Sequence, residues 1–395
     1  MGTSHMDGQP GASLPAAVHH FFSQKSWIEG KATDQLSQIA TLPEVEAIAA
    51  FPDLHPGKFG PVGCAVLSKR LYPHLIGNDI GCGMSLFALR LEARQLRLDK
   101  AAEKLRDLEG PWNGDANSRL TEIGLSRSLH PAALGTIGGG NHFCELQVVD
   151  DVAENEQTSD LRKGQLVLLV HSGSRSLGPE VFDTVQAYDH GLEQNSALAT
   201  QYLEQHAQVV VWASLNRRII AERAAHALKS DIVPIADVPH NLAERYRDCL
   251  LHRKGAARAD LGLTPLAGSR NTLSYVVRPT GRHPGSLLSL AHGSGRKYDR
   301  SSMTGRAGKT KSDREALKRN ASGGFIICED RQLLIEEAPQ AYKSSQHVLD
   351  ELVSFGLVTR VASLKPLLTY KKSSQDIRDR KRHKVRDENR RRRSW

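Results

Sequence analysis

Four short segments of this 395-residue chain place a His or a Cys beside glycines at the edge of a predicted strand. They are "NDIGCGM" (78–84), "GTIGGGNHFCEL" (135–146), "HSGSRSLG" (171–178) and "AHGSGR" (291–296). Functional sites are usually built on such strand-end loops, because a rigid sheet holds the ends of the loop. The glycines let backbone amides approach an anion and adopt positive φ. The pattern therefore predicts a sheet whose loops carry a site.

The rest of the chain alternates short apolar runs with helical patterns. We expect strands at 63–68, 84–91, 142–149, 165–170, 273–277, 286–291 and 324–328, and helices at roughly 92–108, 178–230, 240–252 and 339–356. No linker is rich enough in Pro, Gly or Ser to divide the chain. The prediction is an α+β fold, a single large body with mixed β-sheets flanked by helices and an active site on strand-end loops.

The formal net charge of +9 is concentrated in the last part of the sequence. Residues 371–395 carry 12 of the 53 Lys and Arg and 4 of the 44 Asp and Glu, a net charge of +8. Such a segment is typical of a disordered or weakly helical appendage that neutralises phosphates, and a solubilising tail is the alternative. We expect a folded domain over 7–372, a basic disordered tail over 373–395, and an expression tag in residues 1–6.

Cysteine usage and hydropathy indicate the class of protein. The five cysteines are widely spaced and odd in number, and no secretory signal is present, so reduced thiols in a cytoplasmic protein are expected. No run approaches the roughly 18 apolar residues of a membrane span. One cysteine with a metal or catalytic role is therefore plausible, although a small buried hydrophobe is the commoner role.

Five side chains in and near the glycine-rich segments are of metal-ligand type. They are Asp79, Cys82, His142, His171 and His240. One thiolate, one carboxylate and three imidazoles would hold two divalent ions if the sulfur of Cys82 bridges them. Each residue alone is more often structural, so the hypothesis depends on the whole set. This set of donors suits zinc or cobalt at least as well as manganese.

The strand after the three glycines also suggests a nucleotide site. If 141–146 is extended, Asn141, Phe143 and Glu145 face one side while His142 and Cys144 face the other. An aromatic ring and a carboxylate together suit a guanine base, by stacking and by accepting its N–H groups. Ordinary alternation, with Phe143 in the core, is the alternative.

Nine motifs in this order resemble the RtcB family of RNA-splicing and repair ligases over about residues 50–372. They are "FPDLHPG" (51–57), "GNDIGCGM" (77–84), "GTIGGGNHFCEL" (135–146), "LVHSGSRSLG" (169–178), "PHN" (239–241), "RKGAARA" (253–259), "GSRNTLSYVV" (268–277), "HGSGR" (292–296) and "EEAPQAYK" (336–343). The resemblance implies an RtcB-like catalytic domain over 7–372. It also implies a GTP- and Mn²⁺-dependent ligase that joins RNA 2′,3′-cyclic phosphate or 3′-phosphate ends to 5′-hydroxyl ends.

The resemblance also implies roles for individual residues. His292 would be the histidine that becomes covalently guanylylated, and two Mn²⁺ ions would be held by the five ligands above, with Cys82 between them. The residues that would line the guanylate pocket are Asn141, Phe143, Glu145, Ser269, Ser274, Gly293, Tyr342 and Lys371. The partner would be RNA with broken ends, tRNA or rRNA, and the sequence leaves open whether an activating protein assists.

Three departures from the family pattern qualify these expectations. Lys371 is followed by a long tail where relatives end shortly after a Lys-Gly pair. Arg270 and Asn271 replace a Met-Gly pair beside the expected nucleotide pocket, with an effect on nucleotide choice that the sequence leaves open. The shorter chain resembles a compact bacterial branch associated with the repair of nicked RNA. The alternatives are a metal-dependent cyclic phosphodiesterase or nucleotide hydrolase without ligation, and a non-catalytic RNA-binding scaffold.

Overall fold

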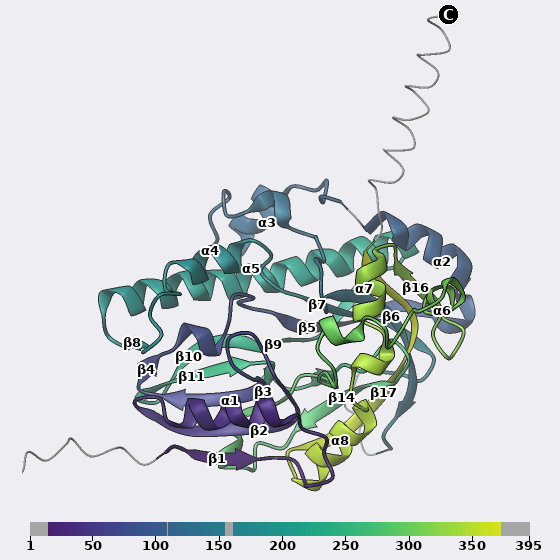
Figure 1. The fold of residues 1–395 in the computed structure, drawn as a ribbon. Helices are drawn as coiled ribbons and strands as arrows, with labels where there is room; N and C mark the ends of the chain where they lie inside the picture. The colour runs from purple at the N-terminus through teal and green to yellow at the C-terminus, as the bar shows by residue number, and fades with distance from the viewer. Residues whose placement is uncertain (1–14, 109, 155–160, 373–395) are drawn as a thin grey trace, which may run out of the picture.

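A mixed eight-stranded sheet forms the centre of the protein in the computed structural model, which describes residues 15–108, 110–154 and 161–372 (Figure 1). Its order is β13-β14-β17-β6-β7-β5-β9, with β16 pairing beside β17. All pairs are antiparallel except β16 with β17. The strands are β5 (Gly83–Glu92), β6 (Phe143–Val152), β7 (Gln165–Ser172), β9 (Ile232–Pro239), β13 (Thr264–Leu266), β14 (Ser274–Pro279), β16 (Phe325–Cys328) and β17 (Val358–Lys372).

A second sheet of five strands has the order β1-β2-β3-β11-β10. Only the pair of β1 with β2 is parallel. These strands are β1 (Ala17–His20), β2 (Val45–His55), β3 (Val62–Ser68), β10 (Asn241–Tyr246) and β11 (Cys249–Lys254). Two small antiparallel pairs complete the sheets, β4 (Arg70–Leu71) with β8 (Leu192–Glu193), and β12 (Ala256–Arg258) with β15 (Ser289–Ala291).

The longest helix, α5 (Ala197–Leu228), runs along one face of the larger sheet (Figure 1). Its side chains Ile220 and Ala224 share a buried cluster with Leu168 of β7. The helix begins where the Ser196 hydroxyl accepts the amide of Ala199, an ordinary N-cap. The other helices are α1 (Gly30–Ala40), α2 (Leu98–Leu105), α3 (Ala116–Glu122), α4 (Leu177–Asp183), α6 (Lys311–Ala316), α7 (Arg331–Glu336) and α8 (Ser345–Ser354).

The two sheets are buried by different helices. Leu36 of α1 packs with Ile48 and Val66 of the five-stranded sheet, and Val348 of α8 packs with Phe51 of β2. The larger sheet is covered by α5 and α2. Helices on sheets in a single body confirm the expected α+β class. The expected tag (1–6) and basic tail (373–395) lie outside the described residues.

The helix expected over 240–252 is wrong, because β10 and β11 form an antiparallel hairpin there. Arg247 turns the chain with φ of 57°, and β11 is paired on both sides, by β3 and β10. Across the hairpin, Glu244 of β10 contacts the buried Arg253 of β11. Tertiary pairing therefore overrides the local pattern.

Other expected elements are confirmed with changed boundaries. The helix expected over 178–230 is two helices, α4 and α5, separated by residues 184–196. The strand expected over 286–291 is shortened to β15, and β6 begins at Phe143 rather than 142. Gly356, with φ of 68°, follows α8 as expected for a helix stop.

Among the described residues, no helix combines the length and apolar character needed to cross a bilayer.

The substitution Trp212→Ala should destabilise the fold strongly. Trp212 on α5 is fully buried and donates its Nε1–H to the carbonyl of Leu129 at 2.9 Å. We expect a loss of about 3–5 kcal/mol in the free energy of unfolding, measured by urea denaturation. Val211→Ala is the matched control, because Val211 is 41% exposed and should change stability by less than about 0.5 kcal/mol. Equal effects of the two substitutions would contradict the burial of this face of α5.

Candidate active site and metal centre

One cavity of about 670 Å³ brings the glycine-rich segments together. The residues expected from the sequence that line it are Asp79, Cys82, Asn141, His142, Phe143, Glu145, His171, His240, Ser269, His292, Gly293, Tyr342 and Lys371. Ser274 is not among the lining residues. Its buried hydroxyl accepts the amide of Gly268 and the Nε2–H of Gln147, each at 3.0 Å, so it supports the wall.

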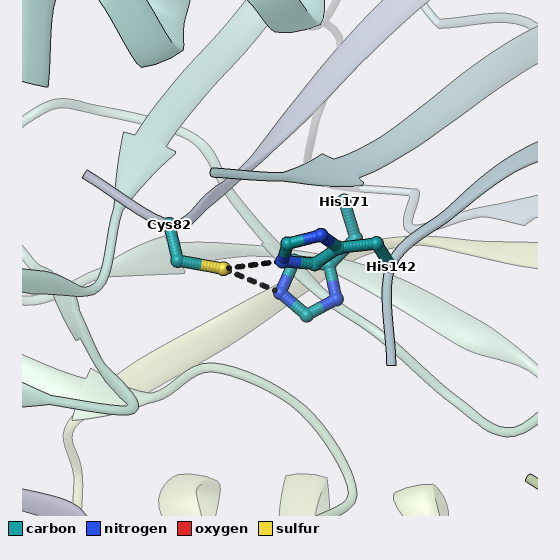
Figure 2. Close-up of side chains that lie close together, drawn as sticks. All are labelled: Cys82, His142 and His171. Atoms are coloured by element: carbon teal, nitrogen blue, oxygen red, sulfur yellow. Dashed lines mark hydrogen bonds between the residues drawn. The ribbon is translucent and has the colours of Figure 1, made fainter. Parts of the chain in front are cut away.

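Cys82 lies at the centre of the cluster of metal-ligand type (Figure 2). Its sulfur points at two imidazole rings, with Sγ 3.4 Å from Nε2 of His142 and 3.1 Å from Nε2 of His171. A tetrahedral ion with Zn–N near 2.1 Å and Zn–S near 2.3 Å would hold such atoms about 3.6 Å apart. The spacing is therefore close to that of ligands around a shared ion.

Two further residues of metal-ligand type contact this cluster. Oδ2 of Asp79 lies 2.9 Å from Nε2 of His142, and Nε2 of His240 lies 3.3 Å from Nε2 of His171. Cys82 thus contacts one member of an Asp–His pair and one member of a His–His pair. Of the five candidates identified in the sequence, Cys82, His142 and His171 lie together, and Asp79 and His240 each contact one histidine of this group.

The outer ring nitrogens of two histidines are held by backbone carbonyls. Nδ1 of His142 lies 3.1 Å from the carbonyl of Ile137, and Nδ1 of His171 lies 3.2 Å from that of Asn141. Each Nδ1–H can donate there, which directs the lone pair of Nε2 at Cys82, the usual support of a metal-bound histidine. Burial lowers the pKa of His171 and of His240 well below the ordinary value, so both rings are neutral and free to bind a cation.

The Cys82 thiol is buried, and this has a consequence for its protonation. Burial raises its pKa well above the ordinary value, and the Asp79 carboxylate adds to the rise. A thiolate at this position therefore needs a strong positive charge beside it. A divalent ion among these donors would supply that charge, so the residues present fit a metal centre.

A buried arginine on α5 supports the loops that carry the ligands. Arg217 Nη1 donates to the carbonyl of Gly81 at 2.7 Å and to that of Ser172 at 3.0 Å, and each carbonyl belongs to the neighbour of a candidate ligand. Its Nε lies 2.8 Å from Oδ1 of Asp237 on β9. Sequence reasoning missed Arg217, because an arginine within "SLNRR" looks like part of a solvated helix face.

Gly138 shows why the loop before His142 is rich in glycine. Its φ is +101°, and a Cβ there would lie 1.8 Å from Nη1 of Arg175 and 2.9 Å from Nδ1 of His142. Any larger residue would displace the histidine ring. The glycine thus permits the close approach that positions the ring.

The other half of the cavity contains the residues expected around a nucleotide. Glu145 is buried, and its carboxylate contacts Thr369 and Gln147. Burial raises the pKa of Glu145 to about 7, although these hydrogen bonds act in the opposite direction. Phe143 and Glu145 alternate on β6 with Cys144, which lies in the core. Asn141 and His142 precede the strand, so the expected alternation does not extend to them.

Glu337 organises the wall of this half and was missed in the sequence. Its Oε2 lies 3.1 Å from Nζ of Lys371 and contacts the hydroxyl of Tyr342, and its Oε1 lies 3.0 Å from Nη1 of Arg296. Burial favours the protonated acid, but Lys371 and Arg296 outweigh it and leave the pKa of Glu337 lowered. Lys371 also donates to the carbonyl of Gly140 at 3.1 Å, so it lies inside the cavity despite the tail that follows it.

His292 lies between the two halves. Its ring centroid is 4.6 Å from that of His240, and its Nδ1 is 2.7 Å from Oδ2 of the fully buried Asp53. The separation is that of an ion pair, although the ring is not oriented for a hydrogen bond to this oxygen. The backbone N–H of His292 donates to the same oxygen at 3.1 Å. Asp53, within "FPDLHPG", is therefore a further residue of the site.

Gly295 permits the approach of this loop to Asp53. Its φ is +67°, and a Cβ there would lie 2.1 Å from the Asp53 carbonyl oxygen. The second glycine of "HGSGR" is thus required sterically where the histidine meets its carboxylate.

Arg270 and Asn271, the two residues that depart from the family pattern beside the expected nucleotide pocket, have different surroundings. Arg270 is buried and lines the cavity, and its Nη2 donates to the carbonyl of Leu334 at 3.2 Å. Asn271 is exposed, and its Oδ1 accepts the amide of Ala321 at 3.3 Å. Only Arg270 is therefore in a position to touch a ligand in the cavity.

Comparison with known proteins gives one consistent result. The family described as "tRNA-splicing ligase RtcB" matches residues 35–122 and 125–372. An RNA-splicing ligase RtcB2 of Escherichia coli is 40% identical over 373 residues, which cover 91% of this chain and 97% of that protein. A tRNA-splicing ligase RtcB of Archaeoglobus fulgidus is 27% identical over 461 residues, which cover 91% and 95%. An RNA-splicing ligase RtcB of Mycobacterium tuberculosis is 26% identical over 434 residues, which cover 84% and 99%.

Cys82→Ala should remove metal from the protein. The sulfur of Cys82 contacts both His142 and His171. We therefore expect the affinity for Mn²⁺ or Co²⁺ to fall by about 100-fold or more, measured by equilibrium dialysis and elemental analysis. Cys144→Ala is the matched control, since Cys144 is equally buried but lies in the core. Unchanged metal content in Cys82→Ala would contradict the central position of the thiol.

Proposed function

Because the chain belongs to the RtcB family of RNA ligases, we propose that it is a GTP- and Mn²⁺-dependent ligase. It would join RNA ends that bear a 2′,3′-cyclic phosphate or a 3′-phosphate to ends that bear a 5′-hydroxyl. The observation that carries the proposal is that one cavity is lined by the Cys82 cluster, by His292 and by Glu145. A nucleotide bound beside Glu145 would therefore lie near the nucleophile His292 and near a cation held at Cys82.

The five residues around Cys82 would hold two Mn²⁺ ions. The sulfur contacts both His142 and His171, Asp79 contacts His142, and His240 contacts His171, which supports a bridging role for Cys82. When bound, the ions would neutralise charge on phosphoryl oxygens and favour departure of pyrophosphate. The choice of manganese rests on the family, because these ligand types also suit zinc or cobalt.

The opposite half would bind the guanine nucleotide. Glu145 would accept N–H groups of the base, and Phe143 and Tyr342 would contact its ring. Lys371 and Arg270 add positive charge, and both are buried. Asn141, Ser269 and Gly293 would surround the phosphate and sugar, with Ser274 supporting the wall.

In the first step, His292 would attack the α-phosphorus of GTP. A new N–P bond forms, the bond between the α-phosphorus and the bridging oxygen breaks, and pyrophosphate leaves. The attacking atom would be Nε2, because Nδ1 faces Asp53. The Asp53 carboxylate would stabilise the positive charge that develops on the ring.

Two further transfers would complete the reaction. The RNA 3′-phosphate attacks the histidine-bound GMP, and an anhydride forms as the N–P bond breaks. The 5′-hydroxyl then attacks the RNA phosphate, a phosphodiester forms, and GMP leaves. A cyclic phosphate would first be opened by water to a 3′-phosphate at the same site.

Membership of the family also suggests the extent of the domain, the compartment and the RNA substrates. Residues 7–372 would act as one catalytic domain, in a cytoplasmic protein that acts on broken tRNA or rRNA. The compact, RNA-repair type rests on the motif resemblance, whereas the similar RtcB2 protein of Escherichia coli is named an RNA-splicing ligase. A cyclic phosphodiesterase that kept the metal cluster is the second candidate, and a guanylyl adduct on His292 separates the two, because hydrolysis of a cyclic phosphate forms no such adduct.

His292→Ala should abolish the covalent intermediate. Purified protein is incubated with Mn²⁺ and GTP labelled at the α-phosphate, and the product is separated on a denaturing gel. We expect an acid-labile label on the wild type, as for a histidine phosphoramidate, and none on His292→Ala, whose metal content and circular dichroism stay unchanged. A label of equal strength on His292→Ala would refute the assignment of the nucleophile.

Glu145 should make GMP binding depend on pH. Its raised pKa, about 7, means that it is protonated below pH 7 and then loses an acceptor for the base. We expect affinity for GMP, measured by calorimetry, to fall as the pH drops from 8 to 6. Glu145→Gln should bind about 10- to 100-fold more weakly at pH 8, with little further change on acidification. The same pH profile in both proteins would show that another group titrates.

A further inference from the structure

An aromatic pair, the exposed Trp27 and the partly buried Tyr298, lies beside the cavity and has no role in the chemistry described above. Trp27 is 42% exposed, and its ring centroid lies 6.3 Å from that of Tyr298 with the planes at 61°. The two rings come from segments about 270 residues apart in the sequence, the loop between β1 and α1 and the loop after "HGSGR".

Three cations surround this pair. Nζ of Lys297 lies 6.0 Å from the centroid of Trp27 and 5.5 Å from that of Tyr298, and Nζ of Lys343 lies 5.9 Å from Trp27. The guanidinium of Arg306 lies 4.3 Å from the centroid of Tyr298. Burial lowers the pKa of Lys343 to about 8, so it remains mostly protonated at pH 7. We call these five residues the aromatic–basic surface.

Backbone contacts join this surface to the active site. Arg296, which lines the cavity, donates from Nε to the carbonyl of Tyr298 at 3.0 Å. Lys343 donates to the carbonyls of Pro52 and Leu54, on either side of Asp53. The surface therefore adjoins the segment that holds His292.

The loop that carries Trp27 is anchored. Ser23 donates its amide to Glu351 Oε2 at 3.0 Å and its hydroxyl to Oε1 at 2.6 Å, and the hydroxyl of Ser26 donates to Oε1 at 2.9 Å. Glu351 on α8 is buried. An exposed tryptophan on an anchored loop is preorganised for contact, which reduces the entropy lost on binding.

Exposed aromatic rings among basic side chains are the chemistry that binds single-stranded nucleic acid. Bases stack on the rings without sequence preference, and the cations follow the phosphates. We propose that the aromatic–basic surface binds the single-stranded RNA next to the break, with one base stacked on Trp27. The proposal rests on the RNA ligase function and adds to it the contact that guides a broken end toward His292.

The test measures binding of a short single-stranded RNA with a 3′-phosphate, and of one with a 5′-hydroxyl, by fluorescence anisotropy. Trp27→Ala should weaken binding of one of them by about 5- to 100-fold, the loss of one base–aromatic stack, and Trp27→Phe should recover most of it. Tyr188→Ala, at an exposed tyrosine outside this surface, should bind like the wild type.

A set of RNAs with single abasic sites separates stacking from a structural role. For the wild type, removal of the base at one position near the RNA end should weaken binding by about the same 5- to 100-fold factor. Removal of the same base should not change the RNA affinity of Trp27→Ala. The proposal is overturned if Trp27→Ala binds as tightly as the wild type, or if the abasic position weakens both proteins equally.

Labelling with GTP on the same preparations keeps this proposal apart from the proposed chemistry. Trp27→Ala should form the guanylyl adduct like the wild type, because Trp27 does not line the cavity. Loss of the adduct in Trp27→Ala would indicate a damaged site and overturn the proposal. A missing adduct in every protein, with the base-dependent binding intact, would contradict the GTP chemistry and support the RNA surface.

Discussion

The geometry of the cavity depends on one ion pair, that of the buried Arg217 with the partly exposed Asp237. The Nε of Arg217 on α5 pairs with this carboxylate of β9, while its Nη1 donates to the carbonyls next to Cys82 and His171. A buried charge is tolerated only when it is paired and hydrogen-bonded, so this residue links the helix, the sheet and two ligand loops in one arrangement. Neighbouring Asn216 adds hydrogen bonds to the loop before the glycines.

The cavity also gathers buried charges that the fold itself does not need. Glu337, Lys371 and Arg296 form a charged group within its wall, and Glu145 is a further buried acid. Burying such groups lowers stability unless they are paired, and a hydrophobic wall would be at least as stable. Their presence in a cavity that is also lined by a thiol and five histidines is the signature of a site built to bind an anionic, hydrogen-bonding ligand.

Much of the candidate metal cluster was predictable, and the residues that support it were not. Cys82, His142 and His171 stand beside glycines at the edges of apolar runs, and that local signal was enough to group them. Arg217 gave no comparable signal, because an arginine in a helix looks like part of a solvated face until the packing is known. Asp53 and Glu337 fall within the motifs at 51–57 and 336–343, but nothing local showed that their carboxylates are buried at the site. The misassigned hairpin at 240–252 has a related cause: β11 is paired on both sides by distant and neighbouring strands, and the local sequence does not show this pairing. The α+β class followed from alternating strand and helix patterns, whereas the two-sheet topology depends on pairings between distant segments.

The most direct test of the account is a ligation assay with the purified full chain. Two RNA oligonucleotides, one ending in a 3′-phosphate and one beginning with a 5′-hydroxyl, are incubated with GTP and Mn²⁺, and the products are analysed by gel and mass spectrometry. The account predicts a sealed strand with one GMP released per junction, and no sealing when GTP is omitted. Removal of the terminal phosphate, or opening of a cyclic phosphate, without any sealed strand would contradict it and identify a phosphohydrolase instead.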